Sequence, residues 1–189
     1  MEHFPLKAGD AVLAVDIQND FCPGGALAVA DGDQVVPAMN RWLKAAADAN
    51  LPAIASRDWH TVDHCSFQAQ GGPWPTHCIQ DTWGAAFHPD LHLPTGTVIV
   101  SKGTAFDRDA YSAFDGTGLT DWLRKKGVKR LWVGGLAEDV CVFHSIKDAC
   151  AAGFQVHLLR NATRPVFPDQ EAPTLEALRE AGTQLEDIA

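Results

Sequence analysis

The chain contains no apolar run approaching the roughly 20 residues that a helix needs to cross a bilayer. Its first residues, Met1 to Pro5, also lack the form of a signal peptide. Basic residues are scarce: 15 lysines and arginines face 24 aspartates and glutamates, and the net charge of −9 argues against a nucleic-acid-binding surface. We therefore expect a cytoplasmic protein that binds neither a membrane nor a nucleic acid.

The cysteines lack the paired spacing of a disulfide-rich domain. There are five of them, at positions 22, 65, 78, 141 and 150, and this odd number favours reduced thiols. Four cysteines in zinc-finger spacing are also absent, so a structural thiolate zinc site is not expected. No internal repeat, low-complexity segment or linker divides the sequence, and we expect a single domain over residues 1–189.

Short apolar runs alternate with stretches of helical pattern, which is typical of a parallel sheet. The expected strands lie near residues 11–16, 52–56, 97–101, 130–134 and 154–159, with a short last strand in 183–188. The expected helices cover about 33–49, 117–126, 140–152 and 171–182. We predict an α/β fold with three layers around a mostly parallel central sheet. Residues 57–96 interrupt the alternation with a long insertion rich in His, Pro, Gly and Trp, and such loops are usually functional.

Cys141 lies where a strand pattern gives way to a helical one. The apolar run 131–133 is broken by Gly134 and Gly135, and helical composition begins at Val140. Backbone N–H groups and the dipole at a helix start stabilise a thiolate, so we expect the pKa of Cys141 to fall below about 8.5. The alternative is a buried structural cysteine.

Two charged residues also follow predicted buried strands. Asp16 ends the run 11–15, and Lys102 comes directly after the run 98–101. Ligands of open α/β sheets bind at the carboxyl ends of the strands, where an acid, an ammonium and a thiol would converge. A nucleophilic thiol needs a base within reach and a third group that orients the base. Taken singly, Asp16 could be a turn residue and Lys102 a solvated cation.

The insertion carries a concentration of histidines next to a carboxylate. Five of the eight histidines lie between positions 60 and 92. Because residues i and i+2 of an extended segment share a side, Asp58 and His60 could chelate one divalent metal, with His77 or His64 reaching it from the loop. These ligand types suit zinc, iron(II) or manganese. The alternative is a surface loop whose histidines bind nothing.

Five blocks of the sequence run in the order of a known enzyme family. They are Asp16–Phe21, Ser56–His60, Trp74–Cys78, Lys102–Gly103 with Tyr111–Phe114, and Gly135–Val142. On these blocks the chain resembles the nicotinamidases, a branch of the isochorismatase-like cysteine hydrolases. The second and third blocks are the more specific to that branch.

The resemblance implies a catalytic triad and a reaction. Cys141 would be the nucleophile, Asp16 the base that takes its proton and Lys102 the third member. The backbone N–H groups of Ala137 and Cys141 would form the oxyanion hole, next to a cis peptide bond between Leu136 and Ala137. The implied reaction converts nicotinamide to nicotinate and ammonia through a cysteine thioester, as a step in NAD salvage, with pyrazinamide as a further substrate.

The resemblance also implies one divalent transition metal, with zinc favoured over iron or manganese. The metal ligands of the family map onto Asp58, His60 and His77, with His64 matching a fourth histidine of some members. The substrate-binding residues map onto Phe21, Trp74 and Tyr111.

Some alternatives remain open at this stage. Glu138 stands where the family usually has threonine, and it either raises the pKa of Cys141 by charge repulsion or points into solvent without effect. Other readings are an amidase for N-carbamoyl or ureido amides, an isochorismatase, and an inactive metal-binding or interaction module. The predicted metal ligands argue against the first, Cys141 against the second and the intact triad against the third. Sheet edges and aromatics such as Trp122 would permit a homo-oligomer.

Overall fold

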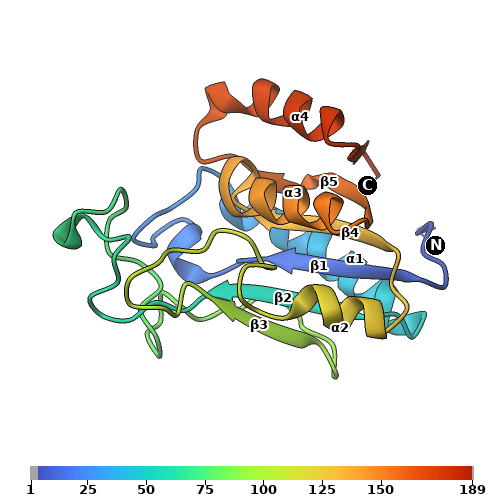
Figure 1. Cartoon of the computed structure of the whole chain (residues 1–189), viewed down its shortest axis with the longest axis horizontal. Coiled ribbons are helices and arrows are strands. Elements are labelled where there is room, and N and C mark those ends of the chain that lie inside the picture. Colours follow the sequence, from blue (N-terminus) through green and yellow to red (C-terminus); the bar gives the residue numbers. More distant parts are fainter. Residues whose placement is uncertain (1–3, 189) are drawn as a thin grey trace.

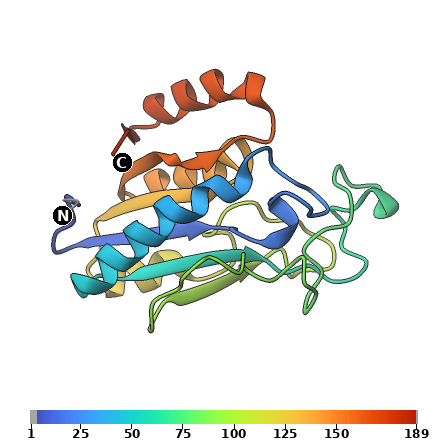
Figure 2. The ribbon, with the colours of Figure 1, turned by 180° about the vertical axis from the view of Figure 1, so that it is seen from behind.

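The computed structural model describes residues 4–188, which form a six-stranded sheet with helices on both faces (Figures 1 and 2). The strand order is β3-β2-β1-β4-β5-β6, and all neighbouring strands are parallel. The strands are β1 (Asp10–Val15), β2 (Ala53–Asp58), β3 (Val98–Lys102), β4 (Arg130–Leu136), β5 (Gln155–Arg164) and β6 (Gln184–Glu186). The predicted α/β fold around a parallel sheet is confirmed.

The helices are α1 (Val35–Asp48), α2 (Leu119–Lys125), α3 (Phe143–Ala151) and α4 (Glu171–Glu180). Successive side chains of a strand point to opposite faces, so β1 supplies Val12 and Ala14 to one core and Leu13 and Val15 to the other. Helix α1 covers the first core, as Figure 2 shows, and α2, α3 and α4 contribute to the second. Both faces of the sheet are therefore buried, which is why its strands read as continuous apolar runs.

The registers of the inner strands bring their carboxyl ends to one edge of the sheet. Val15 pairs with Ser56 of β2 and with Gly135 of β4, and Asp58 pairs with Lys102 of β3. Gly135 has a φ of +123°, and a Cβ at this position would collide with the backbone of Val15. Glycine is therefore required where β4 passes closest to the end of β1.

Several element boundaries differ from the sequence prediction, among them those of β2, β4 and β5. Strand β2 continues to Asp58, so this residue lies on the sheet rather than in the loop that follows. Strand β5 continues to Arg164 because a register shift against β4 lets it run on past its polar residues 160 and 161. The predicted helix 140–152 begins as a π-helical turn, Glu138–Val142, before α3. The two strand extensions arise from pairing with β3 and β4, whereas the π-helical turn is closed locally by a hydrogen bond from the Val142 N–H to the Ala137 oxygen.

The insertion 57–96 extends beyond the carboxyl ends of β1, β2 and β3 (Figure 1). It is held there by isolated bridges such as Gln18–Phe87 and His60–Ile79. Elsewhere, Trp122 is partly buried against the core on the α2 side, so most of its ring is not free for a partner. Within residues 4–188, no helix combines the length and the apolar character needed to cross a membrane.

A buried ion pair joins β1 to β4 at the end of the sheet opposite the insertion. Asp10 is 1% exposed and accepts two hydrogen bonds from the Arg130 guanidinium, each 2.7 Å long. It also accepts a hydrogen bond of 3.2 Å from the Trp132 indole. Burial opposes the charge on Asp10, but these donors outweigh it and lower the pKa of the carboxyl.

We expect Asp10→Ala to lower the free energy of unfolding by about 3 kcal/mol, because the Arg130 guanidinium and the Trp132 indole lose a buried acceptor. Urea denaturation measures the loss. Asp48→Ala, which removes the exposed pair Lys44–Asp48, is the control and should change stability by less than about 1 kcal/mol. Equal losses in the two variants would refute a structural role for Asp10.

Candidate active site

Three of the residues predicted to act together meet at the carboxyl ends of the strands. Lys102 Nζ lies 2.7 Å from Asp16 Oδ2 and 3.5 Å from Cys141 Sγ. It also forms an ion pair with Asp58, which faces it across β2 and β3. All four side chains are buried. The structure thus brings together the acid, the ammonium and the thiol that the sequence placed after separate strands.

Lys102, Asp16 and Asp58 shift one another's pKa values. Burial opposes the charge on Lys102, but the carboxylates of Asp16 and Asp58 outweigh it and raise the pKa of the ammonium well above its usual value. Burial raises the pKa of Asp16, against the opposing effect of Lys102 and a hydrogen bond of 2.7 Å from Ser56 Oγ. The pKa of Asp58 stays well below its usual value because Lys102 and two histidines outweigh burial.

The predicted low pKa of Cys141 is wrong. Burial of the thiol raises its pKa well above the usual value, and the charges of Asp16 and Asp58 raise it further, whereas Lys102 lowers it. Cys141 lies inside the turn Glu138–Val142 with only 5% of its surface exposed, so the loss of water outweighs the helix start that the sequence suggested. The resting thiol therefore keeps its proton and needs a base to become a nucleophile.

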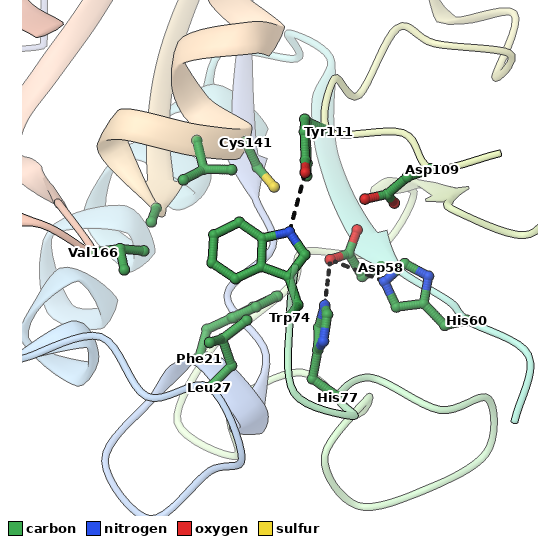
Figure 3. Close-up of a pocket in the computed structure, with 12 residues that line it drawn as sticks. Phe21, Leu27, Asp58, His60, Trp74, His77, Asp109, Tyr111, Cys141 and Val166 are labelled. Carbon is green, nitrogen blue, oxygen red and sulfur yellow. Dashed lines mark hydrogen bonds and ion pairs between the residues drawn. The ribbon is translucent and has the colours of Figure 1, made fainter. Parts of the chain in front are cut away.

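A second group, on the other side of Asp58, has the chemistry of a metal site. Asp58 Oδ2 lies 3.5 Å from His60 Nε2 and 3.7 Å from His77 Nε2, and Figure 3 marks both contacts. The Nδ1 atoms of these histidines contact the backbone oxygens of Gly103 and Pro75 at 2.8 and 2.7 Å. A carbonyl oxygen only accepts, so each Nδ1 donates and each Nε2 is left bare for a metal. These residues fit a divalent transition metal.

Of the two histidines that the sequence left open for this set, His77 joins Asp58 and His60. The His64 ring stacks on His60 at a centroid distance of 4.1 Å, but its ligand nitrogen groups with a nitrogen of His60 and a carboxylate oxygen of Asp109 instead. Spacing along the chain could not separate these two histidines, because the loop between them folds back on itself.

A cavity lies between the thiol and the metal-binding group. Its aromatic and apolar wall includes Phe21, Trp74 and Tyr111, the three residues predicted to bind substrate, and Trp74 Nε1 donates a hydrogen bond of 3.1 Å to the Tyr111 hydroxyl. Figure 3 shows the Cys141 thiol and the Asp58 carboxylate lining this same space. A flat ring that carries one polar edge suits such a cavity.

Sequence reasoning missed two residues of the site. Gln18 is fully buried. Its Nε2 donates a hydrogen bond of 2.8 Å to the Asp58 backbone oxygen, and its Oε1 accepts one of 2.8 Å from the Asp58 backbone N–H. Gln18 thus fixes the backbone of a residue of the candidate metal site. Asp109 lines the cavity from the segment after β3. Gln18 lies within the first matching block and could have been singled out there, whereas no local signal marks Asp109.

The peptide bond between Leu136 and Ala137 is cis, as the resemblance implies. Ala137 lines the cavity beside Cys141. A carbonyl group attacked by the Cys141 thiol would therefore lie next to both residues.

Comparisons with known proteins agree with this geometry. Residues 10–189 match the isochorismatase domain. The nicotinamidase of Escherichia coli (strain K12) is 37% identical over 95% of this chain and 95% of its own. The pyrazinamidase of Pyrococcus horikoshii, solved in complex with zinc, has a TM-score of 0.91 and 42% identity, covering 94% of this chain and 98% of that one. L. infantum PnC1, solved in complex with nicotinate, has a TM-score of 0.86 and 36% identity over 94% and 91%. This chain belongs to the isochorismatase family.

Proposed function

We propose that this chain is a nicotinamidase that hydrolyses nicotinamide to nicotinate and ammonia in NAD salvage, and that it also acts on pyrazinamide. One observation carries the proposal: a buried Asp16–Lys102–Cys141 group and an aspartate–histidine metal-binding set flank one aromatic cavity. The full-length similarity to nicotinamidases supports the same substrate. An amidase for ureido substrates would have less use for a metal beside an aromatic ring.

The pyridine ring would lie between Phe21 and Trp74, with the hydrogen bond from Trp74 to Tyr111 keeping the indole in place. Asp58, His60 and His77 would hold one divalent transition metal, and zinc in the P. horikoshii relative supports zinc here. When bound, the metal supplies a Lewis-acidic partner for the pyridine nitrogen and so orients the ring. The carboxamide on the ring would then face Cys141.

Attack by Cys141 requires its proton to move to Asp16. Both groups lie beside the Lys102 ammonium, at 3.5 and 2.7 Å, so the negative charge stays next to the same cation whichever group carries it. The raised pKa of Asp16 strengthens it as a base for this transfer. Because the total charge of the buried group does not change, the transfer avoids the large desolvation cost of creating a new charge.

Bond formation between Cys141 Sγ and the amide carbon pushes negative charge onto the amide oxygen. The backbone N–H groups of Ala137 and Cys141 would stabilise this oxyanion, each by about 3 kcal/mol. Protonated Asp16 then donates its proton to the leaving nitrogen, which departs as ammonia and leaves a thioester. Asp16 finally takes a proton from water, the hydroxide adds to the thioester carbon, and nicotinate leaves as Cys141 regains its proton.

The thiols of the chain support the proposed cytoplasmic location. All five cysteines are free, and Cys22, Cys78 and Cys141 are buried. A buried thiol nucleophile needs to stay reduced to work, which suits a reducing compartment.

Glu138 is a buried carboxyl rather than a solvated one. It is 2% exposed, so the interpretation that it points into solvent is wrong. Burial raises its pKa to about 7, helped by Glu171 and Asp139 and opposed by Arg160 and Arg164. Among the described residues, its Oε1 has no hydrogen-bond partner. Glu138 is therefore a buried carboxyl that stays protonated below about pH 7, in the turn that carries Cys141.

We expect Cys141→Ala to lose ammonia release from nicotinamide by at least about 10³-fold, because no other group forms the thioester. The metal content of the same samples should stay at the wild-type level. Cys150→Ala, which removes a thiol near Thr183 away from the cavity, should remain active. An active Cys141→Ala would refute the nucleophile, and a wild-type protein that is inactive with metal bound would refute the substrate.

We expect His77→Ala to bind zinc about 10-fold more weakly or worse and to raise KM for nicotinamide, since both the metal and the ring lose a fixed position. Chelator-treated wild type should recover activity when zinc is added back, whereas the variant should not recover fully. The matched control is His92→Ala. His92 is an exposed histidine of the same insertion and contacts Asn40 of α1. Unchanged zinc affinity in His77→Ala would argue against the proposed ligand set.

Because the pKa of Glu138 is raised on folding, the free energy of unfolding should depend on pH through this group. The folded protein binds the Glu138 proton more tightly than the unfolded chain does. The stabilisation by this proton is therefore complete below about pH 4.5 and is lost as the pH rises through about 7. We expect Glu138→Gln to raise Tm over wild type at about pH 8 but not at about pH 4.5. Glu176→Gln, at an exposed position, is the control. The same Tm difference at both pH values would contradict the assignment.

A further inference from the structure

Asp139 joins the turn that carries the thiol to a segment that is distant in the chain. It lies in the turn Glu138–Val142, two residues before Cys141, and the proposed mechanism assigns no role to it. Its Oδ1 accepts a hydrogen bond of 2.8 Å from the Val166 N–H, and its Oδ2 accepts one of 2.9 Å from the Phe167 N–H. Hydrogen bonds to an ionised carboxylate are roughly twice as strong as those between neutral groups.

The segment that Asp139 holds lies between two regular elements. Strand β5 ends at Arg164, and a short 3-10 turn begins at Pro168. Pro165 and Pro168 have no backbone N–H, so Val166 and Phe167 carry the only backbone donors of residues 165–168. Both donors bind Asp139. This one carboxylate therefore satisfies every backbone N–H of the segment.

Val166 also belongs to the cavity wall. It lines the cavity together with Leu27, Ala137 and Val140, which form an apolar side. Figure 3 shows Val166 across the cavity from His60, one of the residues of the candidate metal site. A pyridine ring whose nitrogen faces that site would turn its far side toward this apolar wall.

We propose that Asp139 is a positioning residue for the proposed hydrolysis. Its carboxylate holds Val166 at a fixed distance from Cys141, and the cavity is thereby closed on the side away from the metal-binding group. The inference rests on the proposed function, which supplies the identity of the ring. A fixed wall limits the orientations that a bound ring can adopt, and the carboxamide stays aimed at the thiol.

The segment, rather than the turn, should move when the carboxylate is removed. Phe167 is 49% exposed, and residues 165–167 lie outside any helix or strand. The turn is closed by its own hydrogen bond of 3.0 Å from the Val142 N–H to the Ala137 oxygen. Loss of Asp139 should therefore weaken binding of the ring and leave Cys141 in place.

We expect Asp139→Asn, which keeps the size of the side chain but only one acceptor oxygen, to raise KM for nicotinamide about 10-fold. The kcat should change by less than about 3-fold, because the thiol and its base keep their positions. Hydrogen exchange of the Val166 and Phe167 amides should become faster. Asp169→Asn is the control, since it removes the same charge from an exposed carboxylate of the same connection and should leave KM unchanged.

A double-mutant cycle with Val166→Ala tests whether Asp139 acts through the cavity wall. Val166→Ala alone should also raise KM, and its effect combined with Asp139→Asn should be smaller than the product of the two single effects. A purely structural role would lower the fraction of active protein, so kcat would fall at constant KM.

The proposal is overturned if the two effects on KM multiply, if kcat falls while KM stays constant, or if KM is unchanged although the two amides exchange faster. If Asp139→Asn does not fold, Asp139→Glu replaces it with the same expectations, because its longer side chain displaces the segment. Failure of the proposed function would look different, because wild-type protein with metal bound would then release no ammonia from nicotinamide.

Discussion

The site depends on one buried cation, the ammonium of Lys102. A charge in the interior is tolerated only when it is paired, and Lys102 is paired with Asp16 and Asp58 while it contacts Cys141. These partners come from the residue directly after β1, the last residue of β2 and the turn after β4, so the contacts with Lys102 also fix the relative positions of these elements. Without the ammonium of Lys102, two buried carboxylates would face each other unpaired. The arrangement of Asp16 and Asp58 at this end of the sheet therefore depends on Lys102.

Asp58 links the two halves of the site. One of its carboxylate oxygens pairs with Lys102 and the other faces His60 and His77, so a single side chain joins the nucleophile group to the metal-binding group. Gln18 fixes the Asp58 backbone through two hydrogen bonds. The distance between the reacting thiol and the ring-orienting position is therefore set by strand β2 rather than by a flexible loop, as precise positioning of a substrate requires.

The high pKa of the Cys141 thiol is consistent with this arrangement. A thiolate exposed at a helix start would be reactive before substrate arrives, whereas a buried thiol becomes nucleophilic only when a base takes its proton, and Asp16 is the base proposed here. The sheet holds the buried Asp16–Lys102–Cys141 group, and the insertion 57–96 adds His77 and Trp74 to the cavity. In the proposed mechanism, the reacting thiol thus comes from the sheet and part of the cavity wall from the insertion.

Local sequence patterns were enough to predict the parallel α/β sheet, the placement of Asp16 and Lys102 at strand ends, and the nearness of Asp58 to His60, because these follow from residues close together in the chain. Three features became visible only in the folded chain: His77 joins Asp58, Asp109 lies beside His64, and Cys141 and Glu138 are buried with raised pKa values. Those outcomes depend on contacts between segments far apart in the chain and on the exclusion of water, which local sequence patterns do not encode.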